Sequence, residues 1–409
     1  MGAEHASTAG APPAGYPVAV FGPFLPYRGG IAHHTTLLAR TLAGTHPVLG
    51  INFRRLYPGL LFPGRTQFDE SAAPLAAEGV RTVRLVDSIL PHTWPGAVRA
   101  ARDFGTRLLV VQWWHPFFAP CTAALSRGVR RAGGRVVFLC HNVLPHERSR
   151  VDAALVRLGL GSADGFLVQS KADLETLARL FPDRPRAHTP HPAYTFFARG
   201  GVDRASARAA LGVEGPVALF FGLVRPYKGL DVLLRALALA RRELPVTLVV
   251  AGEFYGDRRP YEALVADLGL GSAVRLLDRY VPNEEVESYF RAADIVVLPY
   301  VSATQSGIAQ IALSFERPVI VTDVGGLPEA VRPGETGFVV PPRDPERLAA
   351  ALVEFFAAGG ASRMAPHLAG EAARFSWAAM AAAVHGMAAS LGLPAIPDPA
   401  VRSPGASVL

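Results

Sequence analysis

Two cations in the second half of the sequence have the residue types and spacing to hold a phosphate group. Arg225 and Lys228 lie in "FFGLVRPYKGLDVLLRAL", between a predicted buried strand that ends near Gly222 and a predicted helix. Arginine offers a planar fork for phosphate oxygens, lysine offers a point charge, and the positive end of a helix adds to both. The pair therefore predicts a diphosphate site. Two solvated cations on a surface turn are the alternative.

The segment "SATQSGIAQIALSFERPVI" (302–320) contains a second predicted helix start. Thr304 and Ser306 are good helix-capping residues, and Gly307 lets a ligand approach the backbone. Gln305 between them offers a neutral amide that both donates and accepts hydrogen bonds. Further on, Glu329 in "VGGLPEAV" follows a turn at a helix start, which is an ordinary design even without a ligand. All five residues, together with Gly222 at the end of the predicted strand before Arg225, are assigned to the predicted donor site.

A glycine pair in the first half marks a third loop of the same kind. "FGPFLPYRGGIAHHTTLLARTLA" predicts a strand, a loop with Gly29 and Gly30, and then a helix whose first amides can bind an anion. This pattern is weak by itself, because most glycine pairs before helices are backbone turns.

A histidine follows directly after a predicted strand in "FLCHNVLPHERS". His141 there could hydrogen-bond a sugar hydroxyl or take part in proton transfer. A metal site built from His141, His146 and Glu147 is not favoured, because the helical spacing of two ligands and an accompanying Cys or Asp cluster are missing. We predict no metal site, and His146 is interpreted as a residue that fixes the loop.

These loops follow strands in a pattern that occurs twice. Short β-branched runs alternate with amphipathic helical runs, which is typical of parallel sheets covered by helices on both faces. In such sheets ligands bind outside the carboxyl ends of the strands. The predicted strands are 16–22, 46–52, 81–86, 107–112, 135–140 and 164–170, then 217–222, 246–252, 273–277, 294–300, 317–323 and 336–340. The predicted helices of the first half are 31–43, 96–104, 119–132, 150–160 and 170–180.

Composition sets outer limits on the function. The chain of 409 residues is half hydrophobic, enough for two domains with separate cores, and its formal charge of +7 favours anionic partners. The cations are dispersed and no nucleic-acid-binding module is found, so nucleic acid is not an expected partner. Cys121 and Cys140 lie among apolar residues and are expected to be buried thiols, which fits a reducing cytoplasm.

No segment reads as a membrane span or a signal peptide. Residues 1–15 are rich in Ala, Gly and Pro and are predicted to be a disordered leader. The most apolar stretch, "RLLVVQWWHPFFAPCTAAL", is interrupted by Gln112, His115, Pro116 and Pro120. We expect a cytoplasmic protein, and peripheral contact with the inner membrane face is one alternative.

The order of motifs resembles the retaining nucleotide-sugar glycosyltransferases of the GT-B fold, the group that includes enzymes similar to sucrose-phosphate synthase and lipopolysaccharide mannosyltransferases. "GLVRPYKGLDVLLRAL", "ADIVVLPY", "PVIVTDVGGLPEAV" and "TGFVVPPRDPERLAAAL" carry the resemblance. It implies an α/β protein with two Rossmann-like, doubly wound domains that face each other across a cleft. The expected divisions are a leader (1–15), an acceptor-binding domain (16–197), a donor-binding domain (198–375), a helix that crosses back (376–392) and a loose tail (393–409).

The resemblance also implies residue roles. Arg225 and Lys228 match the basic pair on the donor diphosphate, Gly30 matches the glycine loop near the phosphates, and His141 matches the histidine on the donor sugar. The chain departs from the family where two glutamates eight residues apart are usual, because Ala303 and Ile311 stand at the aligned positions.

The missing carboxylates predict an altered site rather than a dead one. Positioned cations and amides can stabilise a departing diphosphate without a metal or other cofactor. Gln305 can replace a carboxylate by a neutral amide, and a charged-to-neutral exchange weakens a hydrogen bond by roughly 1–2 kcal/mol. The resulting hypothesis is transfer of a sugar from a nucleotide diphosphate sugar to an acceptor hydroxyl with retention, in the synthesis of polysaccharide, glycolipid or another glycoconjugate.

The acceptor and two other function classes stay open. "FRRLYPGLLFPGRTQF" and "QWWHPFF" combine aromatic and basic residues, as a surface for a lipid-linked or aromatic acceptor would, or else Trp113, Trp114 and Phe117 are packing residues. A nucleotide-sugar epimerase or hydrolase of the same fold would use a similar phosphate grip without an acceptor. A non-catalytic nucleotide-sugar-binding protein would bind and do nothing more.

Overall fold

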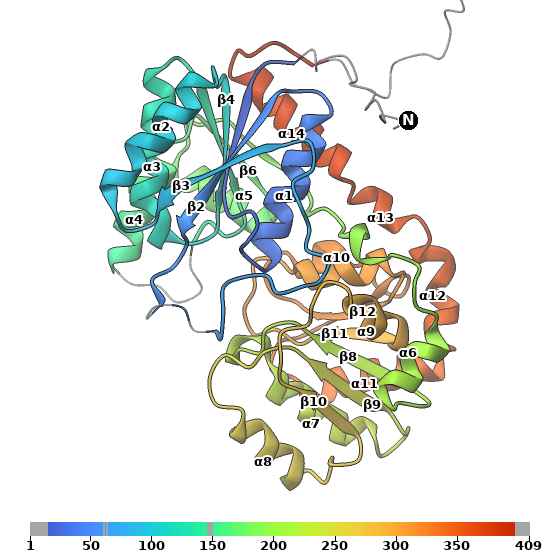
Figure 1. Cartoon of the computed structure of the whole chain (residues 1–409). Helices are drawn as coiled ribbons and strands as arrows, with labels where there is room; N and C mark the ends of the chain where they lie inside the picture. Colours follow the sequence, from blue (N-terminus) through green and yellow to red (C-terminus); the bar gives the residue numbers. More distant parts are fainter. Residues whose placement is uncertain (1–14, 60–61, 63, 145–149, 397–409) are drawn as a thin grey trace, which may run out of the picture.

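The first half of the chain forms a seven-stranded parallel sheet (Figure 1). The computed structural model describes residues 15–59, 62, 64–144 and 150–396. The strand order is β3-β2-β1-β4-β5-β6-β7. The strands are β1 (Val18–Phe21), β2 (Val48–Arg55), β3 (Arg81–Asp87), β4 (Leu108–Trp113), β5 (Arg135–Cys140), β6 (Gly165–Val168) and β7 (Arg186–His188).

The second half forms a six-stranded parallel sheet of the same kind. Its order is β10-β9-β8-β11-β12-β13. The strands are β8 (Val217–Phe221), β9 (Thr247–Ala251), β10 (Val274–Leu277), β11 (Ile295–Leu298), β12 (Val319–Thr322) and β13 (Gly337–Val340). In both sheets the chain begins near the middle, moves to one edge and then reverses. This is the doubly wound topology that the alternating pattern predicts, so the predicted fold class is confirmed.

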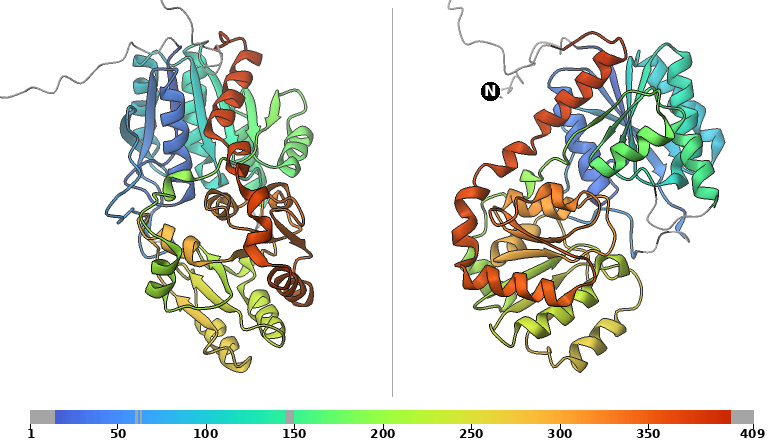
Figure 2. Two further views of the ribbon diagram at one scale, coloured as in Figure 1. Left: turned by 90° about the vertical axis from the view of Figure 1, so that its right-hand side faces the viewer. Right: turned by 180° about the vertical axis from the view of Figure 1, so that it is seen from behind.

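Helices cover both faces of each sheet (Figures 1 and 2). In the first half they are α1 (Gly30–Ala43), α2 (Trp94–Asp103), α3 (Ala119–Arg131), α4 (Arg150–Leu160) and α5 (Lys171–Leu180). The rest are α6 (Arg204–Leu211), α7 (Leu230–Ala240), α8 (Arg259–Asp267), α9 (Val286–Ala292), α10 (Gly307–Ser314), α11 (Pro345–Ala357), α12 (Gly360–Leu368), α13 (Glu371–Arg374) and α14 (Trp377–Ser390). The predicted strands and the five predicted helices of the first half are present with small shifts at their ends.

The central strands are buried on both faces, which explains their continuous apolar runs. All four residues of β1 lie in the core between β2 and β4, where Val18 pairs with Val48 and with Leu108. In the second half, Leu230, Leu233, Leu234 and Leu237 form the fully buried stripe that their helical spacing predicts. Such burial is worth about 1.5–3 kcal/mol for each large aliphatic side chain.

The last helix returns to the first sheet. Figure 2 shows the C-terminal helices running along the second domain and then along the first. Met380, Val384 and Met387 of α14 pack with Val20, Leu139 and others in the core of the first sheet. The Trp377 indole donates to the carbonyl of Ala193 at 2.8 Å.

Cys121 and Cys140 are free and buried, as predicted, and burial raises the pKa of Cys121 to about 12. Among the described residues, no single helix is both long and apolar enough to cross a membrane. The pair α11 and α12 has sufficient length and apolar character only when taken together, and it bends by 86°.

Candidate functional site

The loop after β8 brings the predicted diphosphate cations to the start of α10. Gly222 has φ 94°, and a Cβ built on it would lie 3.3 Å from Ile308 and 3.5 Å from the Lys228 ammonium. A short 3-10 helix, Pro226–Lys228, follows, and Gly229 (φ 67°) then starts α7. Only glycine fits at Gly229 without displacing the chain, because a Cβ would meet the carbonyl oxygen of Pro299 at 2.1 Å.

Lys228 is buried with 9% of its surface exposed. Its ammonium lies 5.3 Å from the centre of the Tyr300 ring, and the structure gives it no hydrogen-bond or ion-pair partner within the described ranges. Burial lowers the pKa of Lys228, Tyr227 opposes this shift, and the charge of Arg225 adds a smaller lowering effect. A buried cation without a carboxylate is costly, so a ligand with negative charge is the natural partner for it.

Arg225 stands beside Lys228 and faces the first domain. Its guanidinium stacks over the Tyr255 ring at 4.7 Å. Burial raises the pKa of Tyr57 to about 12 and lowers the pKa of His115, and the Arg225 charge is close enough to have a smaller lowering effect on both. Arg225 therefore lies between the predicted donor loops and the first domain.

The loop 302–307 is fixed by backbone contacts with the turn after β12. The amide of Gly326 donates to the carbonyl of Thr304 at 2.7 Å, and a Cβ on Gly325 (φ 53°) would lie 1.9 Å from the carbonyl oxygen of Ala303. Ser306 caps α10 by accepting from the Ile308 amide at 3.2 Å. Such close approach holds the first amides of α10 beside Gly222 and Lys228.

Gly29 and Gly30 form an open start of α1. Gly29 has φ 100°, and a Cβ on either glycine would meet nothing within 4 Å. The carbonyl of Gly30 accepts from the Tyr194 hydroxyl at 3.2 Å, and the Tyr194 ring lies 3.3 Å from a Cβ built on Gly307. Tyr194 thus connects the glycine loop of the first domain with the start of α10.

His141 follows β5 and is buried. Its Nε2 donates to Gln112 Oε1 at 2.6 Å, and its ring lies edge-on to His34 with centroids 4.6 Å apart. Burial and the neighbouring His191 lower the pKa of His141 to about 3, so the ring is neutral at neutral pH. A neutral imidazole here can orient a hydroxyl by hydrogen bonding. His146 and Glu147, predicted in the same loop, lie outside the described residues.

Glu329 contacts the first domain. Its Oε1 accepts from the Lys171 amide at 2.9 Å, and its Oε2 lies 3.2 Å from His188 Nε2. It lies in a short 3-10 helix, Leu327–Ala330, where the sequence predicts an α-helix start. These partners make Glu329 an interdomain contact in this structure.

Several residues that sequence reasoning missed join the two domains at the same place. Gln305 Nε2 donates to Gln169 Oε1, and Gln169 Nε2 donates to His34 Nε2 at 2.9 Å. Arg28 pairs with Glu253. Position was the only signal available in the sequence. Gln169 directly follows β6, Glu253 lies two residues after β9, and Arg28 precedes the glycine pair.

The aromatic residues of the first domain divide between the buried core and a partly buried layer packed against it. Trp113 is 1% exposed and belongs to the core, so packing is the correct interpretation for it. Trp114 is half-buried and donates from Nε1 to the Tyr57 hydroxyl at 3.1 Å, and Phe117 stacks on Tyr57 at 5.7 Å.

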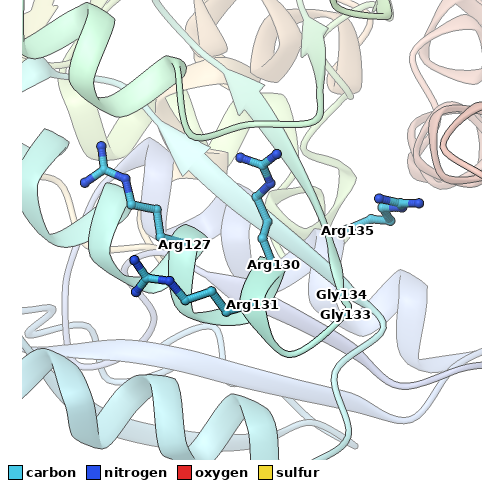
Figure 3. A pocket seen from close by; sticks show the side chains of 6 residues that line it. All are labelled: Arg127, Arg130, Arg131, Gly133, Gly134 and Arg135. Carbon is cyan, nitrogen blue, oxygen red and sulfur yellow. The ribbon is translucent and has the colours of Figure 1, made fainter.

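Two cavities lie elsewhere, on the outer face of the first domain. One, of about 520 Å³, is lined by Arg127, Arg130, Arg131 and Arg135 with Gly133 and Gly134. Figure 3 shows that the four guanidinium groups do not converge on one point. Arg130 pairs with Asp164 at 3.0 Å, and Arg135 donates to the carbonyl of Leu391 at 3.0 Å. The last turn of α3 suits cations because of the helix dipole, which explains why arginines gather there. Because two of the arginines already have protein partners and the four do not converge, they do not form one anion site.

Comparison with known proteins identifies the family. The family model "Glycosyl transferases group 1" matches residues 215–358. D-inositol 3-phosphate glycosyltransferase of Acidothermus cellulolyticus is 30% identical over 321 residues, which cover 75% of this chain and 68% of that protein. The chain belongs to the group 1 glycosyltransferases. D-inositol 3-phosphate glycosyltransferase 1 of Catenulispora acidiphila is 34% identical, over 64% of this chain and 66% of that protein.

Solved structures of other proteins share the fold of this group 1 glycosyltransferase over almost its whole length. Sucrose-phosphate synthase from Thermosynechococcus elongatus superposes with a TM-score of 0.70 at 21% identity, covering 92% of this chain and 99% of that one. Anabaena Alr3699/HepE in complex with UDP gives 0.69 at 17% identity, covering 92% and 100%. At these identities the likeness establishes the GT-B fold alone. The chain spans 68% of the first curated relative and about half of most others, for example 53% of one from Streptomyces scabiei.

Proposed function

We propose that this glycosyltransferase moves a sugar from a nucleoside diphosphate sugar to an acceptor hydroxyl with retention of configuration. The observation that carries the proposal is the buried Lys228 ammonium, which has no hydrogen-bond or ion-pair partner among the described residues and lies beside Gly222 and the start of α10. A diphosphate would supply the missing negative charge. Arg225 and the first amides of α10 would share it.

The proposed step leaves both reacting oxygens on one face of the sugar. The bond between the anomeric carbon and the diphosphate oxygen breaks as the bond to the acceptor oxygen forms. The acceptor's proton passes to the departing phosphate oxygen. Arg225 and Lys228 stabilise the charge that develops on the diphosphate, where preorganised cations act most strongly.

In this proposal the neutral side chains of His141 and Gln305 orient the sugar. The pKa of about 3 makes His141 a hydrogen-bonding residue rather than an acid at neutral pH. Gln305 lies nearby. It is linked through Gln169 to His34, whose ring contacts His141. The predicted glycines, Gly29 and Gly30, leave room for phosphate oxygens at the start of α1.

We also propose that no metal ion takes part. Two cations and two helix starts already offer positive charge to the diphosphate, which is the role that a divalent ion plays in other transferases. Turnover should therefore be unchanged after treatment with EDTA. Loss of turnover with EDTA and recovery with added Mg²⁺ or Mn²⁺ would overturn this part of the proposal.

Calorimetric titration with UDP, GDP and ADP tests the donor site. One of the three should bind the wild-type protein, and the Arg225→Ala/Lys228→Ala variant should bind none. Arg235→Ala, which removes an exposed cation on the neighbouring helix α7, is the matched control and should bind like wild type. Unchanged binding in the double variant would show that the nucleotide lies elsewhere.

Product analysis tests the reaction class. Retention predicts that the anomeric proton of the product keeps the donor's configuration in its NMR coupling constant. An epimerase or hydrolase of this fold would consume donor without an acceptor, and a non-catalytic binder would not consume it at all. Ala303 and Ile311 allow the last outcome, since neither side chain can accept a hydrogen bond.

Peripheral membrane contact is proposed for the α2–α3 surface. A groove of about 540 Å³ there combines Trp94, Pro95 and Val98 with Arg99, Arg127 and Arg131. Ile89 and Leu90, 44% and 37% exposed, precede it. Cations beside exposed apolar side chains suit an anionic lipid surface and would bring a lipid-linked acceptor to the protein.

Liposome co-sedimentation tests this contact. The wild-type protein should sediment with anionic vesicles at low salt, and Arg127→Ala/Arg131→Ala should reduce the bound fraction. Equal sedimentation of the variant, or no binding of the wild type, would remove the membrane from the proposal.

A further inference from the structure

A chain of three side chains crosses the domain interface and ends at Gln305. Gln305 precedes α10 in the second domain, Gln169 follows β6 in the first, and His34 lies on α1. Gln305 Nε2 donates to Gln169 Oε1, and Gln169 Nε2 donates to His34 Nε2 at 2.9 Å. Gln169 and His34 are 4% and 0% exposed, so water does not compete for these contacts.

The hydrogen bonds of the chain have a direction, which the Gln169 amide and the tautomer of His34 set together. Burial, with smaller effects from His141 and His191, lowers the pKa of His34 well below its usual value, so the ring is neutral. A neutral imidazole that accepts at Nε2 carries its proton on Nδ1. Gln169 presents its amide nitrogen to this atom, which leaves its oxygen to accept from Gln305.

The consequence is an unused acceptor on Gln305. Because its Nε2 is committed to Gln169, its Oε1 points away from the chain, and this atom is enclosed without a hydrogen-bond partner in the described structure. An enclosed acceptor without a partner is unfavourable, because it has lost its hydrogen bond to water and gained none in exchange. A ligand hydroxyl that donates to it would remove that cost.

A hydrogen-bond donor without a partner lies in the neighbouring pair, Gln112 and His141. Gln112 uses its Oε1 to accept from His141, and its Nε2 is enclosed and has no partner within the described ranges. The edge-on contact of His34 with His141 puts the two pairs side by side. Sugar hydroxyls both donate and accept, so an unused acceptor and an unused donor in one cluster match them.

We propose that Gln169 is a positioning residue that, together with His34, orients the Gln305 amide so that its oxygen accepts a hydrogen bond from a hydroxyl of the donor sugar. A neutral amide thereby provides the acceptor in a loop where Ala303 has no polar side chain. This inference rests on the proposed function, because it assumes that a sugar occupies the site. It adds a role for Gln169 and His34, which no sequence motif assigns.

Comparing the affinity for a nucleoside diphosphate with the affinity for the corresponding nucleotide sugar isolates the contribution of the Gln305 hydrogen bond to the sugar. The affinity of the wild-type protein for UDP-glucose, GDP-mannose and ADP-glucose, and for the matching diphosphates, is measured by calorimetry. Gln169→Leu removes both hydrogen bonds and frees the Gln305 amide to rotate. It should weaken binding of the nucleotide sugar by about three- to tenfold and leave binding of the diphosphate unchanged.

Gln169→Glu is the conservative rescue. A carboxylate only accepts hydrogen bonds, so it still accepts from Gln305 Nε2 and leaves the Gln305 oxygen in place. His34 can donate to the same carboxylate when its proton moves from Nδ1 to Nε2. This variant should keep the wild-type ratio of the two affinities. A purely structural role for Gln169 would instead lower both affinities together.

A matched control removes another interdomain amide contact. Asn283 Nδ2 donates to Asp69 Oδ2 at 3.2 Å across the same two domains, so Asn283→Leu should leave the ratio unchanged. If Gln169→Leu also keeps the wild-type ratio, the positioning role is wrong while the donor site stands. If the wild-type protein binds none of these nucleotides, both the proposed function and this inference fail.

Discussion

The guanidinium of Arg28 and the carboxylate of Glu253 form an ion pair between the two domains, with 6% and 2% of their side chains exposed. Glu253 follows β9, and Arg28 directly precedes the open glycines of α1. Glu253 also accepts from the Arg65 amide at 2.6 Å, so it holds two segments of the first domain at once. This pair keeps the glycine loop against the donor domain.

Removing Glu253 should open the two domains rather than unfold either one. In Glu253→Ala the Arg28 charge would stay buried without a partner, at a cost of about 3–5 kcal/mol, unless separation of the domains lets water reach it. We expect a larger radius of gyration in small-angle X-ray scattering and weaker nucleotide-sugar binding. Asp257→Ala, which breaks an exposed pair with Arg259 in the same loop, should change neither.

The Lys228→Met substitution should stabilise the folded protein and weaken its binding of the nucleoside diphosphate. The methionine keeps the apolar stem and removes a buried ammonium whose pKa is lowered by burial. We expect a higher melting temperature and at least tenfold weaker binding of the nucleoside diphosphate. A lower melting temperature would mean that the ammonium has a stabilising partner in the free protein.

Gly325→Ala should displace the loop that contains Gln305. Gly325 has φ 53°, and the new Cβ would meet the Ala303 carbonyl oxygen. Gly334→Ala has a similar φ of 79° but meets nothing within 4 Å, so it carries the backbone cost of about 1 kcal/mol without the collision. Turnover should fall in the first variant and persist in the second. Equal turnover would contradict the close approach.

The buried histidines should make the protein sensitive to acid. Burial lowers the pKa of His33 and His191 to about 4 and of His141 to about 3, against 6.5 in the unfolded chain. Between those values the unfolded chain binds more protons, so the free energy of unfolding should fall as pH drops below 6.5. Each such histidine can contribute up to about 1.4 kcal/mol per pH unit, until the folded-state pKa is passed.

Urea denaturation between pH 7 and pH 4 measures this slope. His33→Gln should reduce it, because one low-pKa group is removed, whereas His92→Gln changes an exposed histidine and should not. An unchanged slope in His33→Gln would show that carboxylates rather than buried imidazoles dominate the acid response.

The sequence by itself determined the fold and the positions of the main cations. Alternating apolar runs specify parallel strands and covering helices locally, and the carboxyl-edge rule places Arg225 and Lys228 in loops that follow strands. The buried stripe of α7 followed from the spacing of its leucines alone. Elements without such a period, among them the three-residue strand β7 and the helices α8 and α9, were not predicted.

Only the tertiary structure decided which side chains meet across the domains. Gln305 and Gln169 are 136 residues apart, and Arg28 and Glu253 are 225 apart, so no local spacing relates them. Polar contacts of this kind depend on how two separately folded sheets are placed against each other. Side chains such as Glu329, Gln169 and Arg28 therefore gained their partners only when the domains were assembled.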